Sequence, residues 1–446
     1  MRRYLGPMVD FAERDGTLPE RAEVVVIGGG IAGVSTALFL AERGVDVTLC
    51  EKGYVGGEQS SRNWGWVTAR NRDMRELPLC LESGRLWCEM NERVGGETGY
   101  RRTGSLRAFT SAEQEATGSA WLDDAKQFDF PARMVSAAEM SQMVPASRGA
   151  FSGGLYAEQD GRAEPQTAAP AIANGARKKG AKVFTRCAVR GLQLSAGRVS
   201  AVVTEHGHIN CDSVVLAGGG WSTLFLRRLG VRLPQLLVQA SAMRTVPFDY
   251  PVTPTLYGDR FSLRKRLDGG FTIGDPFATL TDLTPDSFRF AGDYFAMLSM
   301  SWRRLGFRFG RRALREWTRS SSWSLDQISP FEKVRVLDPA PAQRLLQNTH
   351  KALVAALPEF ADVPIAQQWG GLLDVTPDAV PVISGIEKVP GLFLICGFSG
   401  HGFGMGPGAG YLMADLVTGT PPIVDPTSFR YSRFTDGSNP KPKAGF

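Results

Sequence analysis

The clearest pattern of hydrophobic and polar positions lies in residues 24–51. An apolar, β-branched run leads into three glycines. A stretch with helical apolar spacing follows and stops at Gly44, and a second apolar run ends at Glu51. This order predicts a strand, a glycine-rich turn, a helix and a second strand. Such a unit opens a doubly wound parallel sheet, so we expect an α/β fold.

The same reasoning extends along the chain. The spacing of apolar residues, together with turn residues, predicts helices over residues 78–92, 111–128, 165–179 and 411–419, and another helix that begins at Ser136. It predicts strands over residues 182–192 and 391–396, and a hairpin formed by residues 199–205 and 208–214. Residues 261–267 and 271–274 flank Asp268-Gly269-Gly270, which is a strong hairpin signal. Residues 1–20 have no such pattern and are read as an N-terminal extension that is poorly ordered unless it docks.

The glycines in the first turn have the spacing G-x-G-x-x-G, as Gly28, Gly30 and Gly33. In a dinucleotide site the first allows the tight turn, the second lets a pyrophosphate approach the backbone, and the third lets helix and strand pack closely. The helix N-terminus then directs its free N–H groups at the pyrophosphate. Glu51 is suited to ribose hydroxyls and repels a 2′-phosphate, so the motif indicates FAD or NAD rather than NADP.

Two later segments also have an apolar run followed by glycines. The apolar run 213–217 meets Gly218, Gly219 and Gly220 before Trp221, which predicts a second lining of the ligand site or, alternatively, a loop between packed elements. After the strand 391–396, residues 397–410 contain seven glycines and lead into a helix. Amides and a helix dipole at that point suit the pyrimidine edge of a flavin, which becomes negative on reduction.

Composition narrows the class of protein. The chain has 446 residues, 43% of them hydrophobic, which is ordinary for a globular protein. The start has no apolar core of a signal peptide, and no window approaches about 18 uninterrupted apolar residues. Six scattered cysteines without a C-x-x-C pair predict reduced thiols in a cytoplasmic protein, with no zinc or iron–sulfur site and no other metal.

The formal net charge of +6 is concentrated in one segment. Between residues 302 and 319 lie seven arginines and a single acid, Glu316. Apolar residues at spacings of three and four predict a basic amphipathic helix over about residues 287–319. It has three readings: a surface helix packed on its own domain, a contact with an acidic membrane surface or protein partner, or a lid over the active site. One helix is a small footprint for nucleic acid, which we exclude. The arginines are Arg303, Arg304, Arg308, Arg311, Arg312, Arg315 and Arg319.

Several motifs in order resemble one family. The nucleotide fingerprint is followed by SSRNWGWV (60–67), ELPLCLESGRLW (76–87), SVVLAGGGWS (213–222), WGGLLDVTPDAVPVIS (369–384) and GFSGHGFG (397–404). The chain thereby resembles, over about residues 22–430, the FAD-dependent amino acid and amine oxidoreductases that include glycine oxidase, monomeric sarcosine oxidase, D-amino acid oxidase and DadA-type dehydrogenases. The resemblance rests on the order and spacing of these motifs and not on any single one of them.

The resemblance implies a Rossmann-type, discontinuous FAD-binding domain of residues 21–98, 155–235 and 379–432. A substrate domain with a mixed or antiparallel sheet would take residues 99–154 and 236–378. The implied reaction is hydride transfer from the amine-bearing carbon to flavin N5, and the resulting imine hydrolyses. No general base is required if the amine binds neutral.

The resemblance also implies which residues contact FAD. They are Gly28, Gly30, Ile31, Ala32, Gly33, Glu51, Lys52, Ser60, Ser61, Arg62, Asn63, Trp64, Val189, Gly218, Gly219, Trp221, Gly400, Gly402, Phe403 and Gly404. His401 matches a family position beside the flavin, and a structural imidazole bonded to backbone is the alternative.

The chain departs from the family at both usual carboxylate anchors. Gly404 stands where sarcosine oxidase relatives have lysine, and Leu373 stands where glycine oxidase relatives have arginine. Arg70 or Arg72 falls near another family arginine, and either is equally readable as a solvated side chain. Tyr257 is a candidate pocket hydroxyl or a core tyrosine. The substrate is therefore an amino acid, a secondary amine or a larger, opine-like compound.

Two further departures concern the flavin. Gly371 aligns with the cysteine that binds FAD covalently in sarcosine oxidase relatives, so FAD is expected to be noncovalent. Thr272 aligns with the lysine that promotes reaction with oxygen. Its loss favours a dehydrogenase that uses a quinone or partner flavoprotein over an oxidase that uses O2, although Arg264 and Lys265 on the facing strand are possible substitutes.

Three alternatives stay open from the sequence. The chain is the flavin-bearing subunit of a hetero-oligomeric amine or opine dehydrogenase, docking through the arginine-rich segment at the inner membrane surface or on a partner. It is an NAD-dependent dehydrogenase, which leaves residues 397–410 unexplained. Or it is a nucleotide-binding protein without catalysis.

Overall fold

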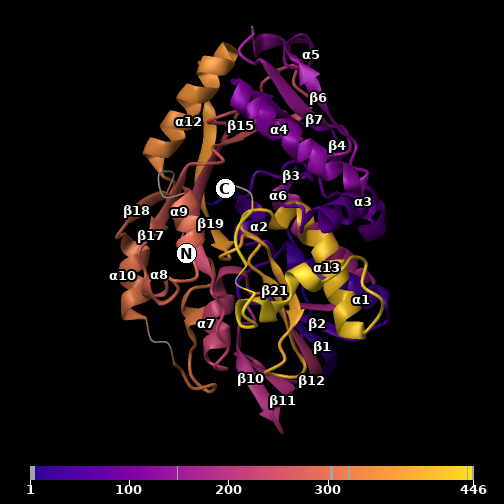
Figure 1. Ribbon diagram of the computed structural model, residues 1–446. Coiled ribbons are helices and arrows are strands. Elements are labelled where there is room, and N and C mark those ends of the chain that lie inside the picture. The colour runs from indigo at the N-terminus through magenta and orange to yellow at the C-terminus, as the bar shows by residue number, and fades with distance from the viewer. Residues whose placement is uncertain (1–5, 148, 302–304, 320–321, 439, 444–446) are drawn as a thin grey trace.

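The computed structural model describes residues 6–147, 149–301, 305–319, 322–438 and 440–443. Within these residues the strands form two large sheets and a small three-stranded one (Figure 1). The chain passes between the two large sheets several times, so each is assembled from segments far apart in the sequence.

The first sheet has a parallel centre. β1 lies between β2 and β12, and β9 and β21 extend the parallel order on the two sides. A β10–β11 hairpin and strand β20 add antiparallel edges. The bounds are β1 (Arg21–Ile27), β2 (Val47–Glu51), β9 (Lys182–Thr185), β10 (Val189–Ser195), β11 (Arg198–Thr204), β12 (Gly207–Leu216), β20 (Val382–Gly385) and β21 (Leu392–Cys396).

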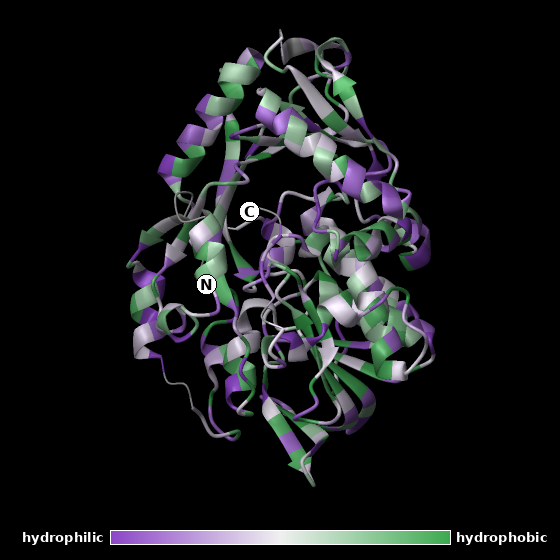
Figure 2. Cartoon of the chain, viewed as in Figure 1, coloured by the Kyte–Doolittle hydropathy of each residue, from purple (hydrophilic) through white to green (hydrophobic). Residues whose placement is uncertain are grey.

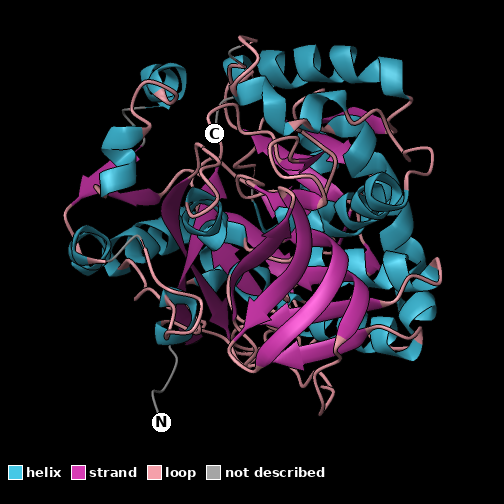
Figure 3. Ribbon diagram, turned by 90° about the horizontal axis from the view of Figure 1, so that it is seen from below, coloured by secondary structure: helices cyan, strands magenta, loops and turns pink. Residues whose placement is uncertain are grey.

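Both faces of this sheet are covered. Val24 and Val26 on β1 belong to a core shared with four helices, and Val25 and Ile27 face a second core. A strand buried on both faces explains the uninterrupted apolar run in the sequence. Figure 2 shows these strands as predominantly hydrophobic, and Figure 3 shows them from below with helices packed around them. The four helices are α1 (Ile31–Glu42), α3 (Leu77–Val94), α6 (Pro165–Lys178) and α13 (Gly402–Thr418).

The second sheet is largely antiparallel and has the order β18-β17-β13-β16-β15-β14-β5-β7-β6, with β19 paired along β13. Helix α12 packs on β13 and β16, and α4 and α5 pack near β6 and β7. The strands are β5 (Ser105–Phe109), β6 (Ala132–Ser136), β7 (Gly153–Ala157), β13 (Leu236–Thr245), β14 (Thr255–Tyr257), β15 (Ser262–Lys265), β16 (Phe271–Gly274), β17 (Thr279–Asp282), β18 (Leu305–Arg308) and β19 (Ile365–Val375). The helices are α4 (Ala112–Ala125), α5 (Ala137–Met143) and α12 (Gln343–Ala356).

Smaller elements connect the two halves. The three-stranded sheet, in the order β3-β8-β4, joins the chain after α2 to the segments that enter and leave the second sheet. Its strands are β3 (Trp66–Val67), β4 (Arg101–Arg102) and β8 (Gly161–Arg162). The short elements that flank the junction are α2 (Gln59–Arg62), the 3₁₀ turn η3 (Gly219–Trp221) and α7 (Ser222–Arg227).

Several expectations from the sequence are confirmed. The mixed α/β fold is present, and β11–β12 and β15–β16 are antiparallel hairpins as predicted. Ser136 caps α5 with a full capping box to Glu139, which explains the helix start that the sequence indicated.

The N-terminal extension is docked where the structure describes it. The amide of Gly6 donates to Asp338 Oδ1 at 3.0 Å, and the amide of Asp10 donates to the carbonyl of Gln166. Asp15 pairs with Arg177 on α6 at 3.0 Å, and its carboxylate accepts the amide of Val183 on β9 at 2.7 Å. The segment therefore crosses α6 and ends beside the edge strand β9.

The single basic helix over residues 287–319 is a wrong prediction. The described part contains α8 (Pro285–Arg289), α9 (Phe295–Ser301), β18 and α10 (Arg311–Thr318) instead. β18 pairs in parallel with β17, so tertiary strand pairing overrides the helical spacing there. Trp302, Arg303 and Arg304, which contributed to the predicted helix, lie outside the described residues.

Two other element boundaries differ from expectation. The predicted strand 182–192 is split into β9 and β10, because the chain turns at Arg186 with a left-handed φ of 52°. Helix α13 begins at Gly402, not at Tyr411, so residues 402–410 of the glycine-rich segment are helical. Close packing favours this helix: a Cβ at Gly410 would lie 2.5 Å from Ser35 Cβ on α1.

The described chain has no helix long and apolar enough to cross a membrane. No group of three or more potential His, Cys, Asp or Glu metal ligands occurs among the described residues either. The six cysteines are free thiols, and all except Cys88 are buried.

Candidate FAD and substrate site

The turn after β1 forms a narrow cradle at the carboxyl edge of the parallel sheet. Gly28 has φ of 113°, and a Cβ there would lie 2.3 Å from the carbonyl oxygen of Ala217. A Cβ at Gly33 would lie 2.0 Å from the carbonyl oxygen of Gly28. Glycine is therefore required at both positions. Helix α1 begins beyond this turn without a side-chain cap, so its N-terminus faces the cradle.

Glu51 closes one side of the cradle. Its carboxylate accepts hydrogen bonds from the amides of Gly29 at 2.7 Å and Gly53 at 2.6 Å. Burial raises the pKa of Glu51. A carboxylate at the end of the second parallel strand, beside the glycine turn, has the position needed to accept ribose hydroxyls. Val189 is buried at the start of β10, close to this end of β2.

The segment around α2 faces the same turn. Ser60 Oγ accepts the amide of Ile31 at 2.8 Å, which ties α2 to the start of α1. Asn63 stabilises the following turn, because it donates to the carbonyl of Ser60 at 2.7 Å and accepts the amide of Gly65 at 2.7 Å. Trp64 lies against Gly274 on β16, where a Cβ would fall 2.4 Å from its ring.

Two predicted cofactor residues hold protein carboxylates. Arg62 is buried, pairs with Asp338 at 3.0 Å and donates to the carbonyl of Gly57. Lys52 pairs with Glu58 at 2.6 Å and donates to the carbonyl of Arg335 at 2.8 Å. Both side chains lie beside the cradle, and their charges are compensated within the protein.

The loop after β12 completes this side. Trp221 donates from Nε1 to the Glu58 carboxylate at 3.2 Å, and Lys52 Nζ lies 4.6 Å from the centre of the Trp221 ring. A Cβ at Gly219 would lie 2.7 Å from Gln59 Oε1. A small cavity opens where α2, η3, β13 and β19 meet. Its lining residues are Glu58, Gln59, Arg62, Gly220, Leu237, Leu337 and Leu372.

The C-terminal glycine segment reaches the cradle from the other side. Helix α13 packs on α1, and a Cβ at Gly404 would lie 3.0 Å from the carbonyl oxygen of Trp66 on β3. The carbonyl of Gly404 accepts Trp87 Nε1 at 2.8 Å, and the ring of Phe403 lies 5.4 Å from that of Trp87. The N-termini of α1 and α13 thus come together near α2 and β3.

His401 precedes α13 at its N-cap. Its Nδ1 lies 3.0 Å from Oε2 of Glu76, which is fully buried at the start of α3. Burial lowers the pKa of His401, so the neutral imidazole is favoured near pH 7. The contact is to a carboxylate, which the sequence did not indicate.

Arg70 and Tyr257 also come together, at the boundary with the second sheet. Arg70 is 4% exposed, and its guanidinium carbon lies 5.6 Å from the centre of the Tyr257 ring. The half-buried Arg107 on β5 lies 5.9 Å from the same ring on the neighbouring strand. Burial, together with the nearby charge of Arg107, lowers the pKa of Arg70 to about 10. Two cations that lie largely out of solvent beside one aromatic ring favour the binding of an anion there.

The guanidinium of Arg70 is fixed at one nitrogen. Nε donates to Ser105 Oγ at 2.9 Å, and Ser105 in turn donates to the buried carboxylate of Asp160. The terminal nitrogens of Arg70 have no hydrogen-bond partner among the described residues. They are therefore suited to a ligand carboxylate, which arginine binds in bidentate fashion. Arg72 instead donates back to Thr68 within its own turn.

Thr272 lies on β16 opposite Arg264 on β15. Its hydroxyl accepts from Arg264 at 3.2 Å and from Arg266 at 3.3 Å. Arg264 is buried against Gly65 and makes a bidentate pair with Glu164, at 2.8 and 3.1 Å. Lys265 Nζ donates to the carbonyl of Tyr250 at 3.4 Å. The cation nearest Thr272 is thus neutralised by a carboxylate.

The cradle fits a dinucleotide. The turn at Gly28 and Gly33 excludes side chains, Glu51 offers a carboxylate at the ribose position, and two helix N-termini converge on it. Glycines that let the backbone come close to a ligand, and helix N-termini, occur at both ends of the site, which also suits FAD.

Comparison with known proteins decides the family. Residues 23–416 match the family model described as DAO, FAD dependent oxidoreductase. The chain belongs to this family. The nucleotide is therefore FAD rather than NAD, and the protein is an FAD-dependent oxidoreductase of the amino acid and amine class.

Relatives of similar length occur among curated and solved proteins. Glycine oxidase of Pseudomonas putida is 25% identical over 91% of this chain and 97% of its own. Sarcosine oxidase subunit beta of Rhizobium meliloti is 23% identical over 93% of this chain and 89% of its own. L-amino acid deaminase from Proteus myxofaciens, solved in complex with anthranilate, superimposes with a TM-score of 0.91 at 33% identity, over 96% of this chain and 97% of that one.

Sequence reasoning missed three residues of the site. Arg107 is paired with Tyr257 only through the register of β5 and β14, which no local pattern records. Glu76 contacts His401, and Asp374 near the end of β19 accepts a hydrogen bond from Gln59 on α2. Both lie in motifs of the family resemblance, but neither motif indicates what the carboxylate contacts. The partner of each residue comes from a distant part of the chain, so no local signal could have found it.

Proposed function

We propose that this oxidoreductase oxidises the C–N bond of an α-amino acid. The amino acid loses two electrons and becomes an imine, and water then converts the imine of a primary amine to an oxo acid and ammonia. The observation that carries this proposal is the pair of arginines, Arg70 and Arg107, beside Tyr257. The L-configuration is supported by the L-amino acid deaminases of two Proteus species, which are 33% and 31% identical to this chain.

The chain's own residues have distinct parts in this proposal. Arg70 binds the substrate carboxylate through its terminal nitrogens, while Ser105 holds its Nε. The ring of Tyr257 lies beside both arginines, and its hydroxyl stays protonated because burial raises its pKa. The amine binds neutral, so no general base is needed, and the neutral imidazole of His401 lines the cofactor side. FAD, when bound, supplies the two-electron acceptor.

The cofactor is held without a covalent bond. We assign its phosphates to the turn of Gly28, Gly30 and Gly33 with the amide of Ala32, and its ribose to Glu51. Ile31 lies beside the phosphates, and its amide is held by Ser60 Oγ. The flavin end lies among α2, η3 and the N-terminus of α13. The remaining members of the set are Lys52, Ser60, Ser61, Arg62, Asn63, Trp64, Val189, Gly218, Gly219, Trp221, Gly400, Gly402, Phe403 and Gly404.

We further propose that the enzyme is a dehydrogenase. Positive charge near the reacting flavin atoms favours reduction of oxygen. Thr272 supplies none, and the cation of Arg264 beside it is paired with Glu164. A quinone or partner flavoprotein is therefore the expected acceptor.

An exposed face supports contact with a membrane. Phe295 is 76% exposed, Phe309 65% and Trp317 50%, and Arg311 and Arg315 on α10 are exposed as well. We define this docking face by the exposed apolar residues in and beside α8, α9, β18 and α10: Phe288, Phe295, Met300, Phe307, Phe309, Leu314 and Trp317. Aromatic and cationic side chains together suit an anionic lipid surface, here the cytoplasmic face of the inner membrane.

A second candidate is the flavin-bearing subunit of a hetero-oligomer. The docking face and the relationship to sarcosine oxidase subunit beta favour it. In that case the same face binds a protein partner, and turnover with an external acceptor requires association. Purified chain that is reduced by substrate but reoxidised only after the partner is added would support this candidate over the first.

The test is an anaerobic stopped-flow screen of the FAD-loaded protein against L- and D-amino acids, N-methyl amino acids and opines. Bleaching of the flavin band near about 450 nm by L-amino acids is expected. Mixing the reduced protein with air or a soluble quinone then separates oxidase from dehydrogenase. Bleaching by N-methyl amino acids or opines alone would overturn the assigned substrate, and rapid reoxidation by air would overturn the dehydrogenase assignment.

A further inference from the structure

Asp374, near the end of β19, is a buried carboxylate that joins three loops around the FAD site. Its Oδ1 accepts Gln59 Nε2 at 3.0 Å. Its Oδ2 accepts the amide of Gly397 at 2.7 Å and Gln235 Nε2 at 3.1 Å. All three donors are neutral, and no ion pair among the described residues includes Asp374.

Each donor belongs to a different wall of the cradle. Gln59 begins α2, immediately before Ser60 and Ser61. Gln235 also donates to the carbonyl of Gly219 at 3.1 Å, so it connects Asp374 to η3. Gly397 begins the turn that leads to α13. One carboxylate thereby fixes the spacing of three segments that approach the cofactor from separate parts of the chain.

The turn at residues 397–401 needs such support. Gly397, Ser399 and Gly400 have φ angles of 74°, 52° and 92°. A left-handed conformation is unfavourable for serine, so the surrounding structure must impose it. The amide of Ser399 donates to the carbonyl of Asp374 at 2.9 Å. At the other end of the turn His401 contacts Glu76. Two buried carboxylates therefore hold the turn at its two ends.

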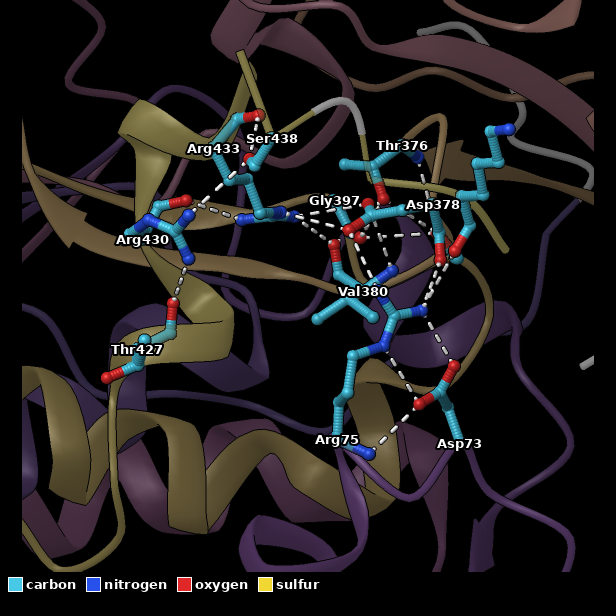
Figure 4. Close-up of polar contacts among 12 residues, drawn as sticks. Asp73, Arg75, Thr376, Asp378, Val380, Gly397, Thr427, Arg430, Arg433 and Ser438 are labelled. Carbon is cyan, nitrogen blue, oxygen red and sulfur yellow. Dashed lines mark hydrogen bonds and ion pairs between the residues drawn. The ribbon is translucent and has the colours of Figure 1, made fainter. Parts of the chain in front are cut away.

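The connection between β19 and β20, which follows Asp374, is itself held by ion pairs. Figure 4 shows Arg433 and Arg75 converging on Asp378, four residues further along the chain. Arg433 donates to Asp378 at 3.0 Å and to the carbonyl of Val380 at 2.7 Å, and Thr376 Oγ1 donates to the same carbonyl at 2.8 Å. Contacts with the C-terminal tail thus fix the β19–β20 connection. Because Asp374 lies just before this connection, its hydrogen bonds place the three segments of the cradle relative to a fixed part of the chain.

Burial disfavours the ionised form of the Asp374 carboxyl group. Burial raises the pKa of Asp374 to about 6, even though three hydrogen bonds oppose that rise. An asparagine fills the same volume without the charge, but its amide nitrogen is a donor, so one of the three bonds must be lost or reversed. The ionised carboxylate accepts all three donors, whereas the protonated form adds an O–H for which this arrangement offers no acceptor.

We propose that Asp374 is the positioning residue of the FAD cradle, and that its ionised form holds α2, η3 and the turn at residues 397–401 in the FAD-binding arrangement. This inference rests on the FAD site described above. Protonation places an O–H among groups that are all donors, so one of the three contacts must rearrange and FAD binding weakens at acid pH.

Other ionisable groups near Asp374 do not titrate in the same range. Cys396 on β21 and Tyr294, just before α9, have pKa values raised well above their usual ones by burial, so both stay neutral. On α2 the charged neighbours are Glu58 and Arg62, which are engaged with Lys52 and Asp338. Beyond β19, Asp378 is paired with Arg433 and Arg75.

The test measures the FAD dissociation constant of the full-length protein from pH 5 to pH 8, by quenching of flavin fluorescence and without substrate. For the wild type, the constant is expected to rise as pH falls below about 6. In D374N it should be about tenfold higher at pH 7.5, as expected for one charged hydrogen bond, and should lose the acid rise. D415N is the matched control, since Asp415 is also buried but lies at the far end of α13 and pairs with Arg43.

A D374N profile that still follows the wild type would overturn the proposal. If D374N does not fold, Q59L removes only the bond to α2. It should weaken FAD binding several-fold while keeping the acid rise, and unchanged binding in Q59L would equally overturn the proposal. Wild-type protein that binds no FAD at all would instead refute the FAD site itself, so the two failures are distinguishable.

Discussion

At the scale of single residues, buried polar groups define the chemistry of this protein. Arg70 and Arg107 are cations in a site where burial penalises charge, and Asp374 is a carboxylate in a similar position. Strongly shifted ionisable groups gather at functional sites because ligands compensate their charge.

The first prediction concerns Arg70. In R70M the substrate carboxylate loses its charged hydrogen bonds, so the substrate concentration for half-maximal flavin reduction should rise by about 30- to 100-fold. The FAD dissociation constant should change little, because Arg70 contacts Ser105 and not the glycine turn. Anaerobic titration measures both quantities. R101M is the control, since Arg101 is an exposed arginine paired with Glu97 on the surface. Wild-type substrate affinity in R70M would contradict the assignment.

The second prediction concerns the stability of the apoprotein. Asp374 has a folded-state pKa of about 6 against an ordinary value of 3.8, so the native state binds its proton more tightly than the unfolded state does. Its contribution to stability is therefore present at low pH and is lost as pH rises from about 4 to about 6. D374N lacks this dependence. The difference in Tm, D374N minus wild type, should increase over that interval in calorimetry, and a constant difference would contradict the pKa shift.

At the scale of elements, strand pairing decides what the arginine-rich segment becomes. β18 pairs with β17, which turns Arg308 towards Asp282 at 2.8 Å, while Arg312 on α10 donates to the carbonyl of Leu237 at 3.0 Å. Arg319 pairs with Glu316 at 2.7 Å. Only part of the basic charge seen in the sequence therefore faces solvent, and Arg311 and Arg315 carry it on α10.

The third prediction follows for the docking face. R311E/R315E should reduce the affinity for vesicles containing phosphatidylglycerol by about 30-fold, because each of the two basic residues near an anionic surface contributes about 1 kcal/mol. Flavin reduction by substrate should be unchanged. R101E/R133E makes the same charge change outside the face and should bind vesicles like the wild type. Equal vesicle binding by both double variants would favour a protein partner or no partner at this face.

At the scale of the whole molecule, the proposed FAD site lies where the two halves meet. The first sheet contributes the glycine turn and Glu51, while β19 of the second sheet contributes Asp374. The cavity between α2, η3, β13 and β19 also lies at this junction. Because the proposed FAD site takes residues from both halves, binding of the cofactor should stabilise the fold as one unit.

The fourth prediction is that removal of FAD lowers Tm. A ligand that binds only the native state stabilises it by about 2.7 kcal/mol at a concentration 100 times its dissociation constant. Thermal unfolding of apoprotein with increasing FAD should show a Tm that rises with the logarithm of FAD concentration. A G33V variant, whose side chain would meet the carbonyl of Gly28, should not respond to FAD. A Tm independent of FAD in the wild type would contradict the site.

Local patterns were enough for the first unit of the fold. The strand, glycine turn and helix at residues 21–42 are specified largely by neighbours in the sequence, since Gly33 packs against the carbonyl of Gly28 five residues earlier. The hairpin β15–β16 was predictable for the same reason, because its turn residues are contiguous. The segment 287–319 was misread because spacing of apolar residues records helix periodicity but not a distant strand that competes for the backbone.

The sequence by itself therefore determined the α/β class, the dinucleotide motif and, through its resemblance, the family and its cofactor. The tertiary structure decided which side chains act together. His401 meets Glu76 across 325 positions, Asp374 meets Gln59 across 315, and Arg107 meets Tyr257 through strand register. Such contacts depend on the packing of whole elements, because burial and hydrogen bonding between distant segments arise only when the sheets are assembled.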